Sequence, residues 1–345
     1  MGEALVTGFS AAGVVAGIKK KSKKELGLIV SERPAAVAGV FTRNRVQAAP
    51  VVVSRARVAR GACRALIVNS GNANCCTGQR GLADAHQMAQ LAAEALGVMA
   101  DDVLVASTGV IGEPLPLERI AAALPSLKQA LSPHGFNDLA EAIMTTDTVP
   151  KLVFESVASD QGTFSIVGVA KGAGMIHPDM ATMLAFVCSD AEIESPLLQR
   201  ILAEGVSRTF NRITIDGDTS TNDMAIVMAN GMSGVKIRAA ERQVLFQTAL
   251  DKVLGELAKA LVRDGEGATK LVEIVVCRAA TTSEAHQVAN TVATSPLVKT
   301  ALFGEDANWG RILAAAGRSG VAFDPELVEI RFDQVTMYAN GTGQG

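Results

Sequence analysis

A threonine at the start of an apolar run is the residue of this sequence best placed to do chemistry. Residues 171–190 read KGAGMIHPDMATMLAFVCSD, and the small, glycine-rich first half is typical of a loop. Residues 183–188 are apolar over the length of a buried strand. Thr182 therefore stands where a loop enters a strand. Its hydroxyl is a weak nucleophile unless a base activates it, and a free α-amine on the same threonine is one such base.

A free amine on Thr182 requires the peptide bond between Ala181 and Thr182 to be cut. The local pattern by itself favours a structural threonine whose hydroxyl bonds to the backbone. In a self-cleaving chain the hydroxyl of Thr182 would instead attack the carbonyl carbon of Ala181, and water would hydrolyse the resulting ester. The released amine has a pKa of about 7.7 to 8.0, which suits a general base near neutral pH. One residue would then supply both the nucleophile and its base.

Strands and helices in alternation are expected to position this threonine. The order strand, loop, helix occurs at 63–69, 70–81 and 82–96, and again at 103–106, 107–109 and 117–124. This order is typical of α/β proteins whose loops face a ligand. Further helices are expected at 137–144, 197–210, 239–262, 284–292 and 312–316. Further strands are expected at 26–30, 35–41, 50–53, 164–170, 224–228, 271–277 and 327–332.

Composition argues against several classes of protein. The chain has 345 residues, 48% of them hydrophobic but only 4% aromatic, and a net charge of -3, so it offers no polybasic field for nucleic acid. The lysine cluster at 19–24 is interpreted as a solvated loop, because no aromatic residue is interleaved with it. No signal peptide is recognisable, and no run approaches the roughly 20 apolar residues that a membrane span needs. Five cysteines, an odd number, indicate a reducing compartment, and we expect a cytoplasmic protein.

Metal ligation is not predicted. Cys75 and Cys76 are adjacent rather than spaced as zinc ligands are. Asp216, Asp218 and Asp223 lack the regular spacing and the glycine of a calcium loop, and they are interpreted as turn residues.

Seven segments, taken in order, resemble the ornithine acetyltransferase family, the glutamate N-acetyltransferases that are bifunctional proteins of arginine biosynthesis. They are TRNRVQAAPV (42–51), IVNSGNAN (67–74), STGVIGE (107–113), MTTDTVPK (144–151), DGDTSTND (216–223), DGEGATK (264–270) and NWGRILAAAG (308–317). The resemblance implies an α/β, self-cleaving threonine-nucleophile fold with interlocked lobes of mixed sheets and flanking helices. It also implies cleavage between Ala181 and Thr182 into an α chain, 1–181, and a β chain, 182–345.

The resemblance implies a ping-pong reaction on small amino-acid substrates. Thr182 takes acetyl from N2-acetyl-L-ornithine, ornithine leaves, and L-glutamate accepts the acetyl group. Acetyl-CoA is a further donor in some members, and no other cofactor is expected. Two α and two β chains are expected to form a heterotetramer.

Further site residues carry over from matching motifs. Thr108 and Gly109 resemble the family's oxyanion hole, which needs donors about 2.7 to 3.1 Å from the developing charge. Thr145, Lys171 and Glu266 match its substrate contacts, together with Thr182. A lysine and a glutamate complement the carboxylate and the amine of an amino acid.

Two alternatives stay open. A self-cleaving aminopeptidase or amidase of related architecture would use water as the acceptor. An uncleaved, inactive family member would serve only as a binding module. The resemblance also implies a further C-terminal segment that supplies an asparagine and a serine or threonine to the substrate site, and its absence here bears on transfer rather than on cleavage, whose residues lie upstream. Neither Asn340 nor Thr342 is assigned to that role.

Overall fold

The first unit of the chain, residues 1–266, is built on one mixed sheet of eight strands. We describe it from a computed structural model, which describes residues 5–19, 23–177 and 183–344. The strand order is β4-β3-β2-β8-β7-β6-β5, with β1 paired to β2. Pairing is parallel for β3 with β4 and for β7 with β8, and antiparallel for the other neighbours. The strands are β1 (Phe9–Val14), β2 (Leu26–Phe41), β3 (Ala62–Asn72), β4 (Val103–Val110), β5 (Lys151–Ser159), β6 (Gly162–Lys171), β7 (Leu184–Ser189) and β8 (Met224–Ala229).

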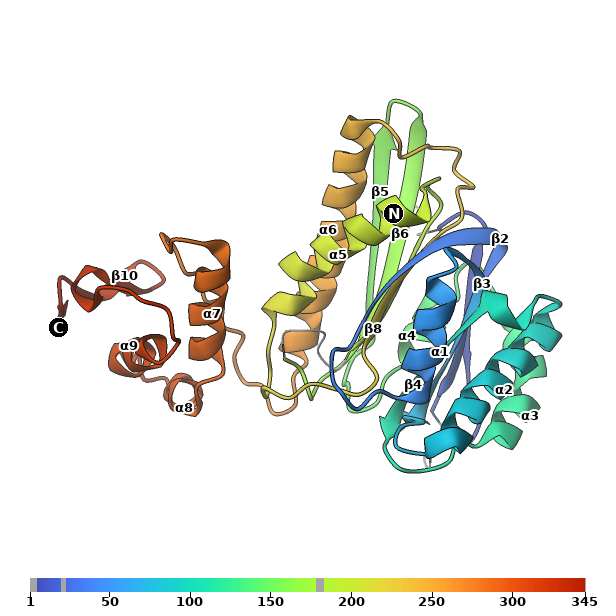
Figure 1. Cartoon of the computed structure of the whole chain (residues 1–345), viewed down its shortest axis with the longest axis horizontal. Helices are drawn as coiled ribbons and strands as arrows, with labels where there is room; N and C mark the ends of the chain where they lie inside the picture. The colour runs from blue at the N-terminus through green and yellow to red at the C-terminus, as the bar shows by residue number, and fades with distance from the viewer. Residues whose placement is uncertain (1–4, 20–22, 178–182, 345) are drawn as a thin grey trace. The chain divides into compact units, whose positions relative to one another are not determined.

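Helices cover both outer faces of this sheet (Figure 1). Near β5 to β8 the outer face packs on α5 (Ser195–Arg208) and α6 (Ala240–Arg263). Near β3 and β4 it packs on α2 (Gly78–Leu96) and α3 (Leu117–Gln129). The remaining strand faces share a core with α1 (Ala49–Val58) and α4 (Phe136–Ala142). The predicted α/β class, with a mixed sheet and flanking helices, is confirmed.

The central strands are buried on both faces, which explains why the sequence shows them as unbroken apolar runs. In β7, Ala185 and Val187 face the core under α5 and α6, whereas Phe186 and Cys188 face the core under α4. Each of the six residues of β7 and of β8 is buried. These two strands follow Thr182 in the sequence, yet they lie between β2 and β6, which precede it.

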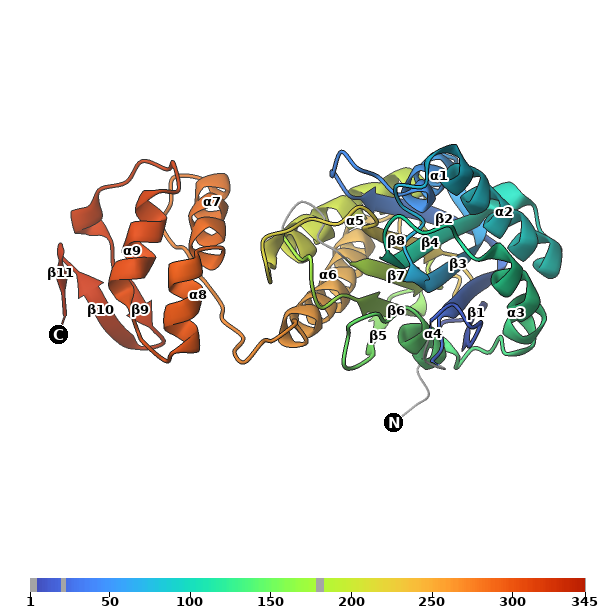
Figure 2. The same cartoon turned by 90° about the horizontal axis from the view of Figure 1, so that it is seen from below.

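The second unit, residues 267–345, has its own small core of Val292, Val298, Ala315 and Ala316. Its elements are α7 (Thr282–Ala293), α8 (Pro296–Phe303), α9 (Trp309–Gly317), β9 (Ile330–Phe332), β10 (Val335–Ala339) and β11 (Thr342–Gly343). Figure 2 shows the helices of this unit beside its three-stranded sheet. The predicted chain division at 181/182 concerns cleavage, and the boundary between the compact units does not test it.

Three predicted elements are wrong. Residues 50–53 are helical, because Pro50 stands in the first turn of α1 and its ring suits that position. Residues 271–277 form no strand, and Leu271, Val272 and Val275 are exposed. The last predicted strand shortens to β9. Strand β5 was not predicted, because its residues are only half-buried and its pattern is mixed.

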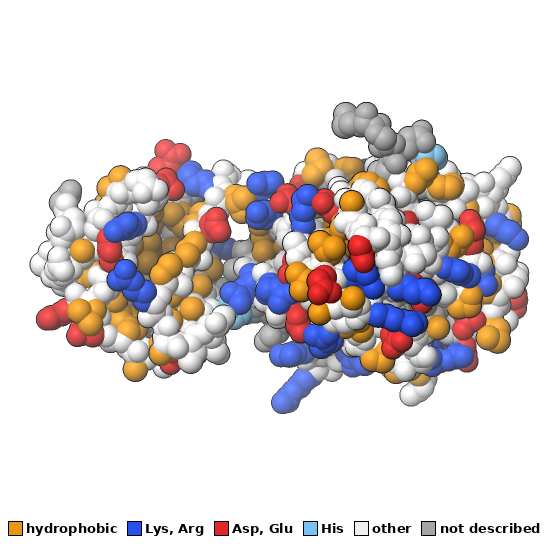
Figure 3. Space-filling model, turned by 90° about the horizontal axis from the view of Figure 1, so that it is seen from above, with side chains coloured by type: hydrophobic (Ala, Val, Ile, Leu, Met, Phe, Trp, Pro, Cys, Tyr) orange, Lys and Arg blue, Asp and Glu red, His pale blue; other side chains and the backbone are white. Residues whose placement is uncertain are grey.

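Charges are mixed on the face drawn in Figure 3, as the small net charge suggests. In the lysine cluster at 19–24, Lys19 and Lys24 are less solvated than predicted, Lys23 is exposed as predicted, and residues 20–22 lie outside the described residues. The Nζ atom of Lys19 donates to the carbonyl of Met144 at 2.7 Å. Lys24 pairs with Asp138 at 2.6 Å and with Glu141 at 2.7 Å. No helix among the described residues is long and apolar enough to cross a membrane.

Candidate active site

The junction predicted from the sequence lies between the end of β6 and the start of β7. Ala181 and Thr182 themselves lie outside the described residues. Met183, the next residue, is held from two sides by the start of β8. Its N–H donates to Oδ1 of Asp223 at 3.0 Å, and its carbonyl accepts from the N–H of Met224 at 3.2 Å. The backbone that follows Thr182 is therefore fixed by neighbouring groups.

Asp223 is a buried carboxyl group, with 1% of the residue exposed. Burial raises the pKa of Asp223 well above its ordinary value, against the opposing effect of Lys171 and of hydrogen bonds from Met183 and Ser220. Its Oδ2 atom is buried and has no hydrogen-bond partner in the described structure. The interpretation of Asp223 as a turn residue is wrong, because an acid in a polar loop is usually solvated and this one is not.

Lys171 is the last residue of β6 and is also buried, with 3% exposed. In the sheet it stands opposite Leu184, so it lies beside the first residues after the junction. Burial lowers the pKa of Lys171, and the nearby carboxylates of Asp147, Asp223 and Glu266 oppose that effect.

Thr108 and Gly109 lie at the end of β4, where β3 approaches very closely. Gly109 has a φ of 136°, and a Cβ added to it would lie 2.3 Å from the carbonyl carbon of Gly71. Only glycine fits there, because both the backbone angle and the space exclude a side chain. Thr108 is buried, with 5% exposed.

Asn222 links this turn to the junction. Its Nδ2 atom donates to the carbonyl of Ser107 at 2.8 Å and to that of Ala73 at 2.7 Å. Asn222 precedes Asp223, whose carboxylate holds Met183. Two consecutive side chains thus connect the turn that contains Thr108 with Met183, the first described residue after the predicted junction.

Asp147 joins two of the predicted substrate residues. Its Oδ2 accepts from the N–H of Thr145 at 3.0 Å, and its Oδ1 accepts from the N–H of Gly172, next to Lys171, at 2.7 Å. Burial alone would raise the pKa of Asp147, but the charges of Lys151 and Lys171, with hydrogen bonds from Lys151 and Gly172, hold it below its ordinary value.

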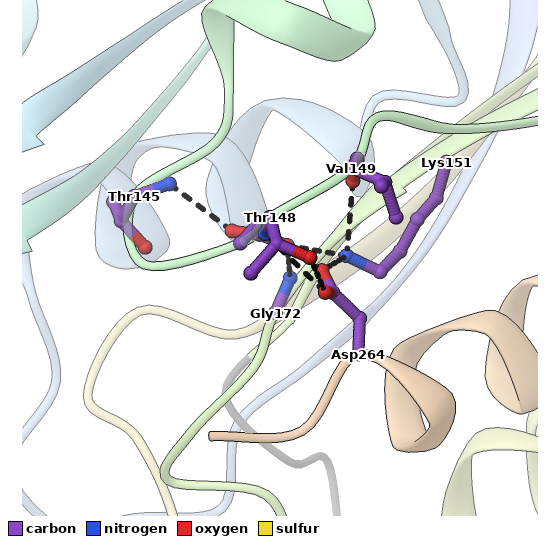
Figure 4. A network of polar contacts seen from close by, with 7 residues as sticks. Thr145, Thr148, Val149, Lys151, Gly172 and Asp264 are labelled. Carbon is purple, nitrogen blue, oxygen red and sulfur yellow. Dashed lines mark hydrogen bonds and ion pairs between the residues drawn. The ribbon is translucent and has the colours of Figure 1, made fainter. Parts of the chain in front are cut away.

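Lys151 completes this network (Figure 4). Its Nζ atom lies 2.7 Å from Asp147 Oδ1 and 2.6 Å from Asp264 Oδ2, and all three side chains are at most 6% exposed. Asp264 also accepts hydrogen bonds from the N–H and the hydroxyl of Thr148. The loop before β5 is thereby fixed to the end of α6, two residues before Glu266.

Glu266 is exposed, and it lies against the loop that follows Lys171. Its N–H donates to the carbonyl of Ala173 at 2.7 Å. Its carboxylate lies over Gly174, since a Cβ added to Gly174 would be 2.9 Å from Glu266 Oε1. The structure therefore places Thr145, Lys171 and Glu266 around one loop, residues 172–177.

Sequence reasoning missed Asp147, Lys151, Asn222, Asp223 and Asp264 as parts of the site. The signals were present, since Asp147 and Lys151 are four residues apart and Asn222 and Asp223 end one of the seven motifs. His177, left out of the chemistry, has its Nδ1 atom 3.4 Å from the hydroxyl of Thr214. In the described residues no group of three or more His, Cys, Asp or Glu is arranged to hold a metal.

The fold and this site define an α/β protein with buried acids and lysines beside a loop–strand junction. The chain belongs to the ArgJ family, whose model matches residues 10–345. It is 52% identical over 343 residues to the arginine biosynthesis bifunctional protein ArgJ of Syntrophotalea carbinolica, covering 99% of this chain and 87% of that protein. The protein of the same name from Geobacter sulfurreducens is 50% identical over 342 residues, with the same coverage. The family resemblance seen in the seven motifs is confirmed.

Solved structures of similar sequence exist for parts of the chain. A crystal structure of arginine biosynthesis bifunctional protein argJ from Bacillus halodurans is 47% identical, covers 51% of this chain and 92% of that chain, and gives a TM-score of 0.49. Ornithine acetyltransferase from Mycobacterium tuberculosis, complexed with ornithine, is 43% identical, covers 50% of this chain and 92% of that chain, and gives a TM-score of 0.48.

Replacing Lys151 by methionine should destabilise the protein by about 3–5 kcal/mol, because two buried carboxylates lose their cation. Urea unfolding followed by circular dichroism measures the free energy. The control is Lys24→Met, which breaks the partly exposed ion pairs with Asp138 and Glu141 and should cost at most about 1 kcal/mol. Equal losses in the two variants would contradict the role given to the buried network.

The buried ion pairs of Lys151 with Asp147 and Asp264 also predict how the free energy of unfolding depends on pH. The pKa values of Asp147 and Asp264 are lowered in the folded protein, so their contribution to stability is complete above the ordinary aspartate pKa of about 3.9. It is lost as the pH falls through the lower folded values. The stability difference between wild type and Lys151→Met should therefore be largest near neutral pH and should shrink as acid protonates the two carboxyl groups.

Gly109→Ala should destabilise the protein by about 1–3 kcal/mol more than Gly112→Ala, since only the first adds a clash with backbone atoms. Both glycines have positive φ angles, of 136° and 90°, and no atom lies within 4 Å of a Cβ added at Gly112. Thermal and urea unfolding of the two variants give the comparison. Similar losses would mean that β3 is free to move away from Gly109.

Proposed function

We propose that this protein is an acetyltransferase of arginine biosynthesis, which moves acetyl from N2-acetyl-L-ornithine to L-glutamate through Thr182. The observation that carries the proposal is the identity of about half the residues to arginine biosynthesis bifunctional proteins over 99% of the chain. The grouping of Thr145, Lys171 and Glu266 beside the junction supports it.

In the proposed reaction, the chain is first cut between Ala181 and Thr182. The free amine of Thr182 then accepts the hydroxyl proton as the oxygen attacks the acetyl carbonyl carbon of the donor. Backbone N–H and hydroxyl groups at Thr108 and Gly109 would stabilise the oxyanion. The C–N bond of the donor breaks, ornithine leaves with the proton, and acetyl remains on the threonine oxygen.

The second half reverses these steps with a new acceptor. The amine of L-glutamate attacks the acetyl ester, and the threonine oxygen is released. Lys171 complements the α-carboxylate of either amino acid, because a buried lysine gains most from an anionic partner. Glu266 is exposed over Gly174, where it meets a cationic amine, and Thr145 supplies a polar contact.

The proposal also covers the subunit composition, the location in the cell and a second acetyl donor. We infer two α chains, 1–181, and two β chains, 182–345, in a cytoplasmic heterotetramer that needs no metal. Acetyl-CoA would act as a second donor through the same threonine, because its thioester is more reactive than the amide of acetylornithine. These features are carried over from the family resemblance of the seven sequence motifs.

Mass spectrometry of the purified protein should show two chains, 1–181 and 182–345. After mixing with N2-acetyl-L-ornithine, the chain that begins at Thr182 should gain one acetyl group, because the ester lasts until an acceptor arrives. L-glutamate should remove that group and yield N-acetylglutamate. Thr182→Ala should remain one chain without an adduct, whereas Thr163→Ala, at an exposed position of β6, should match wild type.

Three results of this experiment would count against the proposal. A single full-length species in the wild type would indicate an uncleaved binding module. Two chains in the Thr182→Ala variant would place the nucleophile elsewhere. Acetate released at the same rate with and without glutamate would indicate an amidase with water as the acceptor.

The two chains should stay together after cleavage, because the sheet orders β7 and β8 between β2 and β6. Separating them would break the ladders from β6 to β7 and from β2 to β8 and expose strands that are buried on both faces. Size-exclusion chromatography in buffer should give one peak containing both chains, and a denaturant should be needed to separate them. Separate elution in buffer would contradict the shared sheet.

A further inference from the structure

An unpaired oxygen lies beside the junction and is not used by the transfer reaction. Asp223 Oδ1 accepts the N–H of Met183 at 3.0 Å, and Asp223 Oδ2 is buried without a hydrogen-bond partner. Leaving a buried polar atom unpaired is destabilising. An atom in this state is a candidate for a chemical role.

Covalent geometry places this carboxyl near the bond that is cut. Three bonds separate the nitrogen of Met183 from the nitrogen of Thr182, so the two atoms are at most about 4 Å apart in any conformation. Asp223 holds the first of these nitrogens directly. The second is the nitrogen that leaves when the bond between Ala181 and Thr182 breaks.

The surroundings of Asp223 favour its neutral, protonated form. Only 1% of the residue is exposed, and burial raises its pKa well above the ordinary carboxyl range. The cation that opposes this shift is Lys171, whose own pKa is lowered by burial. No ion pair between them is formed within 4.0 Å in the described residues, unlike that of Lys151 with Asp147. A protonated carboxyl is able to donate.

We propose that Asp223 is the proton donor for cleavage, delivering a proton through Oδ2 to the nitrogen of Thr182 as that nitrogen leaves Ala181. The inference rests on the proposed function, since it requires the cut at this bond. An amide nitrogen is a poor leaving group until it is protonated, so the step needs an acid. The amine of Thr182 does not yet exist at this stage and is not available for acid–base work.

The step balances without another reactant. The hydroxyl oxygen of Thr182 forms a bond to the carbonyl carbon of Ala181, and the bond from that carbon to the nitrogen breaks. The nitrogen takes the proton of Asp223, and the hydroxyl proton passes to the Asp223 carboxylate, which restores the acid. Water then hydrolyses the ester and leaves the carboxyl of Ala181 and the free threonine.

The asparagine variant separates acid chemistry from anchoring. In Asp223→Asn, the amide oxygen still accepts the N–H of Met183, but the amide NH₂ group does not act as an acid. We expect Asp223→Asn to fold with a melting temperature close to that of wild type and to cleave at least ~100-fold more slowly. Intact mass against time after rapid purification measures the rate.

Asp216→Asn is the matched control. Asp216 also accepts backbone N–H groups in the loop before the junction, from Met175 and Ile176, but it is exposed. Its asparagine variant should cleave at nearly the wild-type rate. Asp223→Glu keeps the acid on a longer side chain and should cleave faster than Asp223→Asn. A purely anchoring role predicts the opposite order, since asparagine is the closer match in shape.

Treatment with hydroxylamine shows at which step cleavage of the Asp223→Asn variant stops, because hydroxylamine cuts an ester at 181–182 but not an amide. We expect it to release no chains from Asp223→Asn, since the ester does not form without the acid. Release of two chains, or cleavage of Asp223→Asn at the wild-type rate while Thr182→Ala stays intact, would overturn the assignment of Asp223. A wild-type chain that is never cut would instead overturn the proposed function.

Discussion

The burial of carboxylates beside a backbone junction is the constraint on which this site depends. Asp147 and Asp223 are both buried, yet their pKa values move in opposite directions. Asp147 has Lys151 at 2.7 Å and the N–H groups of Thr145 and Gly172, so its charge is compensated. Asp223 has no cation within ion-pair distance in the described structure, its Oδ1 accepts the N–H of Met183, and its Oδ2 is buried without a hydrogen-bond partner. One acid therefore anchors loops as an anion, whereas burial favours the neutral form of the other, which accepts the N–H of Met183.

The sheet makes this arrangement insensitive to a break in the chain. Strands β7 and β8 follow Thr182, and they are placed between strands that precede it. Met183 is bonded to Asp223 and Met224 at the start of β8, and Lys171 stands opposite Leu184. Because these contacts come from different strands, the position of the backbone after Thr182 does not depend on the bond before it.

The sequence predicted the class of fold, and it singled out Thr145, Lys171 and Glu266, which the structure places around one loop. Buried strands such as β7 appear as apolar runs, and the motifs place Thr108, Thr145, Lys171 and Glu266 without reference to distant contacts. The network of Lys151 with Asp264 joins residues 113 positions apart, and no local pattern indicates that pairing. The burial of Asp223 was missed for a related reason. Its loop is polar and glycine-containing, and only the tertiary structure removes it from water.

The wrongly predicted helices and strands also reflect tertiary contacts that no local pattern contains. The apolar residues at 50–53 fit a strand or a helix, and the position of Pro50 decides for the helix, because its fixed φ suits a first turn. The run at 271–277 has the composition of a strand, but its large side chains are exposed. Composition predicts what a segment is able to form, whereas pairing decides whether it does.

Cleavage and transfer place similar demands on one set of atoms. In each of the two proposed reactions, the oxygen of Thr182 attacks a carbonyl carbon, an oxyanion forms, and a nitrogen leaves with a proton. The difference is the source of that proton. During transfer the free amine of the threonine is able to return the proton that it took from the hydroxyl. During cleavage that nitrogen is itself the leaving group, so the proton has to come from a neighbour. A neutral acid fixed to the next peptide N–H meets this requirement, and after the cut it is no longer needed as a donor.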